Sequence, residues 1–246
     1  MVSLKQVILA TSGIVLSAAF DIHVRPNGGN VTGKFGQKYA YGFLHEDINN
    51  SGDGGIYAEL IQNRAFQYSE EFPVNISHYY PINGAGLSIQ FLEEPLSAAL
   101  PASMRVSSTN TTGKIGFKNE GYWGMSVQQV KYTGSFWVKG VYSDVFTASL
   151  QSNTTGEVFG EVEIPSKSVA GEWTEHTFEL IPEKNAPNPN NSFAITFDSS
   201  CIGNGSLDFN LISLFPPTYK NRTNGLRVDI AEALADLSPV SALLSR

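Results

Sequence analysis

The sequence predicts a mostly β protein in which a β-sandwich lies beside the start of an α/β domain. Alternating apolar residues recur between about residues 70 and 215, and turn signals separate these stretches from one another. Helical periodicity occurs only before and after that region. The chain has 246 residues, a length that allows one large domain or two small ones.

Composition and charge exclude several classes of protein. The apolar fraction of 41% and the charged fraction of 16% are those of an ordinary globular chain. A formal net charge of -7 argues against a nucleic-acid partner, because phosphate binding needs clustered Lys and Arg. The one cysteine, Cys201, rules out an internal disulfide framework and a cysteine-based zinc site, and the four histidines lack metal-ligand spacing. We therefore expect no metal ion and no cofactor.

The amino terminus has the pattern of a secretory signal peptide over residues 1–19. Lys5 supplies the positive start, Val7 begins an apolar stretch, and the small residues before Phe20 offer a cleavage site. The stretch is too short to span a membrane comfortably, and the sequence contains no other long apolar run. We expect a secreted, extracellular chain that has no membrane association after signal removal.

The Asn-x-Ser/Thr pattern is more frequent than chance predicts. Random placement of the Asn, Ser and Thr residues would give about three such sites. The excess predicts a glycoprotein that passes through a glycosylating secretory pathway. The eight candidate sites are Asn30, Asn49, Asn75, Asn110, Asn153, Asn190, Asn204 and Asn221.

The residues that precede the sandwich predict a βα unit. Residues 20–48 are typical of extended chain, with a short apolar strand at residues 41–44 and a Gly-rich turn at residues 50–55. A helical pattern then follows, with apolar residues at i, i+3, i+4 and i+8. That pattern consists of Tyr57, Leu60, Ile61 and Ala65.

The central region predicts the sandwich. Short strands at regular spacing, with no helical pattern between them, indicate two packed antiparallel sheets. The alternating sets are Leu87, Ile89 and Phe91; Phe146, Ala148 and Leu150; His176, Phe178 and Leu180; Phe193, Ile195 and Phe197; and Leu207, Phe209 and Leu211.

The last segment predicts a helix, in which Asn224 caps the first turn and Pro239 ends the last. Its apolar face contains Leu226, Ile230, Ala233, Leu234 and Leu237. The predicted organisation is therefore a signal peptide at 1–19, a strand and a βα unit at 20–69, the sandwich at 70–215, and a helix that returns to the α/β domain at 216–246.

One carboxylate stands at a position where chemistry is expected. Glu46 follows the predicted strand, and the carboxyl ends of strands are where barrel enzymes keep their active sites. The alternative is a solvated or turn-capping acid. Asp47 is adjacent, so the two side chains point to opposite sides and cannot form the carboxylate pair that glycoside hydrolysis requires.

The aromatic residues of the sandwich suggest carbohydrate contacts. Tyr122 and Trp123 occur between two glycines in a loop context, where an exposed platform for a sugar ring and a buried position are both open. Trp137 and Trp173 fall within strand patterns, which places them in the core.

Two long segments resemble the secreted α-L-arabinofuranosidases of glycoside hydrolase family 51. Residues 42–66, which begin Gly-Phe-Leu-His-Glu-Asp, resemble the opening of those enzymes, and residues 211–229 resemble the segment before their second barrel strand. Residues 119–125 are similar to the family's carbohydrate-binding-type jelly roll. The resemblance implies a jelly-roll sandwich inserted after the first βα unit of a (β/α)8 barrel that is incomplete here.

The resemblance also implies a function. The family hydrolyses terminal non-reducing α-L-arabinofuranosyl residues of arabinoxylan and arabinan with retention. Its acid/base and nucleophile glutamates are expected beyond Arg246, so this chain is expected to have no catalytic pair and no activity of its own. Glu46 would contact the sugar, and Tyr122 and Trp123 would contact plant cell-wall polysaccharide. The alternatives are a non-catalytic carbohydrate-binding module and a sandwich that only braces the barrel, with every tryptophan buried.

Overall fold

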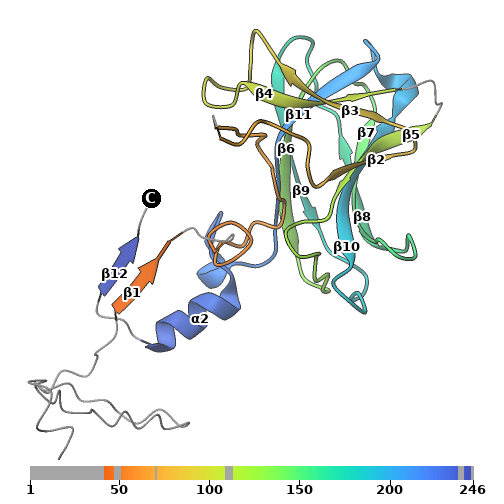
Figure 1. Ribbon diagram of the computed structural model, residues 1–246. Helices are drawn as coiled ribbons and strands as arrows, with labels where there is room; N and C mark the ends of the chain where they lie inside the picture. Colours follow the sequence, from red (N-terminus) through yellow and green to blue (C-terminus); the bar gives the residue numbers. More distant parts are fainter. Residues whose placement is uncertain (1–41, 47–50, 70, 109–112, 238–240, 245–246) are drawn as a thin grey trace, which may run out of the picture. The chain divides into compact units, whose positions relative to one another are not determined.

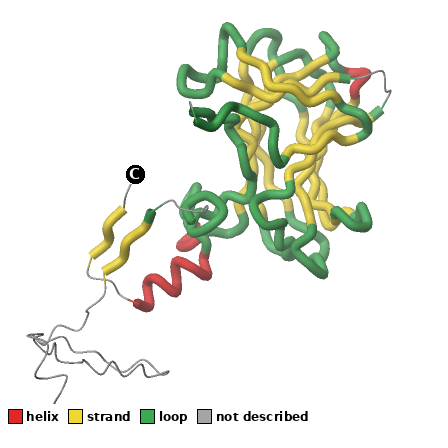
Figure 2. The backbone as a smooth tube through the Cα atoms, viewed as in Figure 1, coloured by secondary structure: helices red, strands yellow, loops and turns green. Residues whose placement is uncertain are grey.

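The computed structural model describes residues 42–46, 51–69, 71–108, 113–237 and 241–244 (Figure 1). These residues include two antiparallel five-stranded sheets, whose strands Figure 2 shows in yellow. The first sheet has the strand order β2-β5-β10-β7-β8. Its strands are β2 (Tyr79–Ile82), β5 (Lys114–Asn119), β7 (Val145–Ser152), β8 (Val158–Pro165) and β10 (Asn191–Asp198).

The second sheet has the strand order β3-β4-β11-β6-β9. Its strands are β3 (Gly86–Phe91), β4 (Ala102–Ser107), β6 (Tyr132–Lys139), β9 (Trp173–Leu180) and β11 (Ser206–Phe215). Each of the five alternating patterns of the sequence falls on one of the strands β3, β7, β9, β10 and β11. The predicted β-sandwich region is thus confirmed as two antiparallel sheets.

The core of the sandwich is built from aromatic side chains of both sheets. Phe136 on β6 lies edge-on to Phe146 on β7, with ring centroids 5.3 Å apart, and Phe197 on β10 stacks on Phe209 on β11 at 5.6 Å. All four rings are fully buried. The period of two residues produces this core, because alternate side chains of each strand point to the same face.

The pattern breaks within β11. Leu211 was grouped with Leu207 and Phe209, but its φ is 46° and the pairing of β11 with β6 shifts register between Asn210 and Ser213. This bulge turns Ile212 and Leu214 into the core, and Leu211 is only half-buried.

The helix predicted around residues 57–65 is wrong, because the described residues 51–69 contain turns and extended chain but no helix. The backbone N–H of Leu60 donates to the carbonyl of Leu214 (3.0 Å), and that of Ala58 donates to the carbonyl of Gly225 (3.1 Å). Asn63 and Phe66 have φ values of 56° and 49°, which an α-helix does not permit. The apolar residues still face the core, since Ile61 and Phe66 are buried. Buried residues of this irregular segment therefore have the sequence spacing of a helix although the segment is not helical.

The strand that pairs with β1 comes much later in the sequence, directly after a helix. Strand β1 (Gly42–His45) pairs in parallel with β12 (Ser241–Leu244), and helix α2 (Val228–Leu237) precedes β12. Parallel neighbours require a crossover connection, which is usually helical. Strand β1, helix α2 and strand β12 therefore follow the order of a βαβ unit, with the sandwich inserted between β1 and α2.

Helix α2 confirms the predicted carboxyl-terminal helix, but its start differs. Asn224 was expected as the cap, whereas the helix begins at Val228 and Asn224 has a φ of 48°. Leu226 and Ala233 of the predicted apolar face are exposed, and Ala231 is buried instead. Pro239 lies outside the described residues.

The core positions predicted for Trp137 and Trp173 are also wrong. Both side chains are only half-buried. Their strand neighbours Phe136, Val138 and His176 are buried instead, so each tryptophan points away from the core.

Several expectations fall outside the described residues: the signal peptide at 1–19 and the sequons at Asn30, Asn49 and Asn110. Of the other sequon residues, Asn75, Asn190, Asn204 and Asn221 are exposed and Asn153 is half-buried. Within the described residues, no helix has the length and apolar character of a membrane span, and no group of three or more His, Cys, Asp or Glu could hold a metal ion.

Candidate functional site

A cavity of about 570 Å³ brings together the two aromatic residues that the sequence singled out. Residues from the segments 54–60, 122–132 and 216–229 line it, together with Pro189. Tyr122 and Trp123 are both among the lining residues, and Trp123 is 74% exposed. We call this space the Trp123 cavity. Trp123 is thus the exposed member of the pair and Tyr122 is half-buried, and a platform for a sugar ring stays a prediction.

The loop that carries Trp123 is fixed at both ends. The side-chain oxygen of Asn119 accepts from the backbone N–H of Gly121 (2.9 Å), and the N–H of Met125 donates to the carbonyl of Pro189 (2.8 Å). Gly124 has a φ of 83°, and a Cβ there would lie 2.2 Å from the Pro189 carbonyl oxygen. The glycine thus allows a tight turn that holds the indole of Trp123 toward solvent.

Tyr122 is held by close approach of the opposite loop. A Cβ on Gly54 would lie 2.3 Å from Cγ of the Tyr122 ring, and the φ of Gly54 is 84°. Only glycine lets the ring lie against this backbone. The cavity wall therefore depends on the Gly-rich turn that precedes Tyr57.

Glu59 also lines the cavity, and this residue is only 2% exposed. Its Oε1 accepts from the backbone N–H groups of Ile61 (3.0 Å) and Leu214 (2.8 Å). Its Oε2 accepts from Ser213 Oγ (2.6 Å) and Arg64 Nη1 (3.3 Å). A carboxylate has about four lone-pair sites, so these donors occupy all of them. Glu59 ties its loop to β11.

Burial raises the pKa of Glu59 above its ordinary value, although the hydrogen bonds from Leu214, Ser213 and Ile61 and the charge of Arg64 oppose that shift. A raised pKa is what a general acid needs, but a general acid must also reach the substrate. Because both oxygens of Glu59 are occupied by protein donors, this group is a structural acid.

The second carboxylate of the cavity is Asp229, at the start of α2. Arg227 binds it with both ends of the guanidinium, Nε to Oδ1 at 3.2 Å and Nη2 to Oδ2 at 2.6 Å. The hydrogen bond from Arg227 holds the pKa of Asp229 below its usual range. With one acid tied to its loop and the other paired with arginine, the cavity offers hydrogen-bonding groups and aromatic faces, which suit recognition of a polar ring more than cleavage of a bond.

Comparisons with known proteins agree with the segments that suggested a family. The alpha-L-arabinofuranosidases A of Aspergillus kawachii and Aspergillus niger are each 36% identical to this chain over 217 residues. Among solved structures, an arabinose-bound α-L-arabinofuranosidase of family 51 is 39% identical, with a TM-score of 0.75, and the match covers 83% of this chain. This chain is related to the family 51 α-L-arabinofuranosidases.

The arabinofuranosidase relationship covers only part of those proteins. The chain spans about a third of the length of the curated relatives, since the matches cover 88% of this chain and 33% of each relative. It likewise covers 34% of the solved arabinofuranosidase. No protein-family model matches the chain.

The arabinofuranosidase resemblance assigned a sugar contact to Glu46. The structure places Glu46 at the carboxyl end of β1, where it is exposed and its backbone carbonyl accepts a hydrogen bond from Ser51 Oγ. It is not among the residues that line the Trp123 cavity. The structure therefore brings Tyr122 and Trp123 together without Glu46, and the sugar contact of Glu46 stays a prediction. Asp47 lies outside the described residues.

Sequence reasoning missed Glu59, Arg227 and Asp229 as parts of this site. Glu59 carries a signal in the sequence, because it stands between Ala58 and Leu60 in an otherwise apolar stretch. A charge in such a stretch is buried only with partners. Its partners Ser213 and Leu214 are more than 150 residues away, at separations of 154 and 155, so the sequence could not name them.

Proposed function

We propose that this chain is the amino-terminal part of a secreted, retaining α-L-arabinofuranosidase. The enzyme would hydrolyse terminal non-reducing α-L-arabinofuranosyl residues of arabinoxylan and arabinan. The observation that carries the proposal is the relationship over most of the chain to arabinofuranosidases, one of which is arabinose-bound. The acid/base and nucleophile glutamates would lie beyond Arg246, and Glu46 would hydrogen-bond the sugar.

The finer fold follows from the same proposal. The sandwich would be the family's jelly roll, and β1, α2 and β12 would begin its (β/α)8 barrel. The parallel pairing of β1 with β12 and the place of α2 between them in the sequence support this assignment. Secretion through the signal at 1–19 and glycosylation at the eight sequons belong to this proposal as well.

An assay of the purified chain tests the catalytic part of the proposal. We expect no release of nitrophenol from 4-nitrophenyl α-L-arabinofuranoside, because retention needs two carboxyl groups about 5 Å apart across the scissile bond. In the Trp123 cavity, Glu59 and Asp229 are both held by protein donors. Hydrolysis by this chain that disappears in Glu46→Gln would contradict the expectation.

A second candidate function is a non-catalytic carbohydrate-binding module, and the exposure of Trp123 favours it. A module that only braces a barrel was expected to bury every tryptophan, whereas Trp123 is 74% exposed. An indole face exposed beside hydroxyl and amide groups suits the C–H face of a sugar ring. The Trp123 cavity would then hold part of an arabinose-containing polysaccharide.

Calorimetric titration with arabinoxylan oligosaccharides tests this second function. We expect Trp123→Ala to weaken binding at this cavity about tenfold, the effect of losing roughly 1.4 kcal/mol. Phe72→Ala is the matched control, because Phe72 is 68% exposed and lines neither this cavity nor the groove described below. Equal affinities in the wild type and Trp123→Ala would remove the cavity as a binding site.

A further inference from the structure

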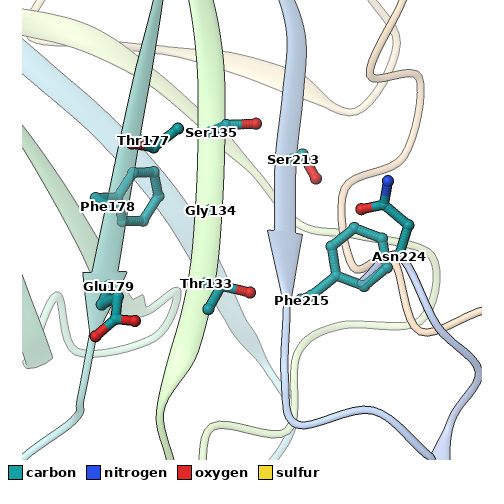
Figure 3. A pocket seen from close by; sticks show the side chains of 9 residues that line it. All are labelled: Thr133, Gly134, Ser135, Thr177, Phe178, Glu179, Ser213, Phe215 and Asn224. Atoms are coloured by element: carbon teal, nitrogen blue, oxygen red, sulfur yellow. The ribbon is translucent and has the colours of Figure 1, made fainter. Parts of the chain in front are cut away.

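A second hollow lies on the solvent-facing side of the second sheet, where β11, β6 and β9 run side by side (Figure 3). It is an open groove of about 490 Å³. Four hydroxyl groups line it, from Thr133 and Ser135 on β6, Thr177 on β9 and Ser213 on β11. Figure 3 shows Phe215 and Asn224 together on one side of the groove and Glu179 on the other.

The same face continues past the groove to the two tryptophans that the sequence had placed in the core. Ser135 pairs with Thr177, the next outward pair is Trp137 with Glu175, and Trp173 pairs with Lys139 beyond it. Outward residues of neighbouring strands are diagonal neighbours, which brings the two indoles within reach of each other. The indole N–H of Trp173 donates to the carbonyl of Glu94 (3.3 Å), which fixes that ring.

The charged groups along this face form two ion pairs, and Glu175 on β9 adds a further negative charge. Lys131 pairs with Glu179 at 2.9 Å. Lys139 pairs with Glu94 at 3.3 Å. A ligand of strong charge would have to compete with these ion pairs, whereas a neutral ligand would not.

We propose that this face, defined by Thr133, Ser135, Thr177, Ser213, Trp137 and Trp173, binds an extended, neutral, hydroxyl-rich oligosaccharide. Hydroxyls both donate and accept hydrogen bonds, and indole faces pack against sugar C–H groups. From the pair Thr133–Glu179 to the pair Lys139–Trp173, the face extends about 20 Å at the rise of antiparallel strands. That length suits several linked sugars rather than one terminal residue. This proposal takes one point from the proposed function, namely that the ligand is an arabinose-containing polysaccharide.

The face and the Trp123 cavity are two separate candidate binding sites. Their lining residues do not overlap. A chain with both sites binds two oligosaccharides, one at each site. The number of bound ligands therefore separates this inference from the function proposed for the Trp123 cavity.

The test is a calorimetric titration of the whole chain with a neutral arabinoxylan oligosaccharide longer than the face. Ser135→Arg fills the groove without removing a buried side chain, and Trp137→Ala removes one aromatic face. Tyr80→Ala is the control, because Tyr80 is 43% exposed on β2 of the other sheet. Circular dichroism of each variant checks that the fold is retained. An oligogalacturonide of the same length tests the preference for a neutral ligand.

We expect two binding events in the wild type and in Tyr80→Ala. In Ser135→Arg we expect only the event at the Trp123 cavity. In Trp137→Ala we expect both events, with binding at the face roughly tenfold weaker, as loss of about 1.4 kcal/mol predicts. Trp123→Ala leaves the event at this face unchanged. The inference is overturned by a titration that Ser135→Arg does not alter, by tighter binding of the oligogalacturonide, or by the absence of binding. Loss of binding in Trp123→Ala alone would support the cavity and not this face.

Discussion

At the scale of single residues, Gly54 decides whether the ring of Tyr122 can line the Trp123 cavity. The ring occupies the place where any other residue would put its Cβ, at 2.3 Å from Cγ. Glycine is required here for two reasons, the contact and the positive φ, and a matched pair of substitutions separates them.

We predict that Gly54→Ala weakens oligosaccharide binding at the Trp123 cavity and lowers the free energy of unfolding by more than Gly156→Ala does. Both glycines have positive φ, 84° and 73°, but a Cβ on Gly156 meets nothing within 4 Å. The backbone cost of about 1 kcal/mol is common to both variants. Urea unfolding and titration measure the difference, and equal effects would mean that Tyr122 is not held by this contact.

The fold shifts the pKa of one buried acid, Glu59. Its carboxylate is buried, and burial raises its pKa above the ordinary value of 4.5. A native pKa above the unfolded one means that protonation favours the folded state. This contribution to stability is fully present below about pH 4.5 and is lost as the pH rises through the native pKa.

Glu59→Gln removes this titration, so the pH dependence of the variant isolates it. We predict that the free energy of unfolding of the wild type, relative to that of Glu59→Gln, falls as the pH rises above about 4.5, because Glu59 ionises only in the wild type and its pKa is raised in the folded chain. Urea unfolding across the pH range measures it. Glu163→Gln, at an exposed position on β8, is the control and should show no such trend. If the stability of the wild type relative to Glu59→Gln rises with pH, the pKa of Glu59 is not raised in the folded chain.

At the scale of elements, the strands could be predicted from the sequence. The helix predicted around residues 57–65, in contrast, does not form. The strand patterns from Leu87 to Phe209 follow the two-residue period, and each lies on a strand. The spacing of Leu60, Ile61 and Ala65 fits a helix equally well, but the Glu59 carboxylate and the Leu214 carbonyl take the backbone N–H groups that a helix would use. The Leu214 carbonyl is distant in sequence from Leu60, so a local pattern cannot reveal that partner.

The two-stranded sheet of β1 and β12 differs from the sandwich in how it is supported. Strand β11 has paired neighbours on both sides, whereas β1 and β12 pair only with each other among the described residues. Two strands without further partners are marginally stable in water.

We therefore predict that backbone amides of Gly42–His45 and Ser241–Leu244 exchange with deuterium at least about a hundredfold faster than those of β6 and β11, a difference of roughly 2.7 kcal/mol in opening free energy. Hydrogen-exchange mass spectrometry of the whole chain measures it. Equal protection of β1 and β11 would show that β1 has support that the described pairings do not include.

At the scale of the whole molecule, the sequence predicted the sandwich and the family but not the way the parts connect. The resemblance placed Glu46 near a sugar, and the aromatic pair between glycines left an exposed and a buried position both open for Trp123. The pairing of β1 with β12 joins residues about two hundred positions apart. Trp137 and Trp173 were assigned to the core because alternation gives two faces without saying which one is buried.

The account claims that this chain recognises arabinose-containing polysaccharide without cleaving it. Equilibrium dialysis against an arabinoxylan oligosaccharide, followed by chromatography of the recovered ligand, measures binding and cleavage in one sample. The account predicts that the oligosaccharide concentrates on the side of the protein and is recovered intact. Free arabinose in the recovered ligand, or an equal concentration of oligosaccharide on both sides of the membrane, would contradict it.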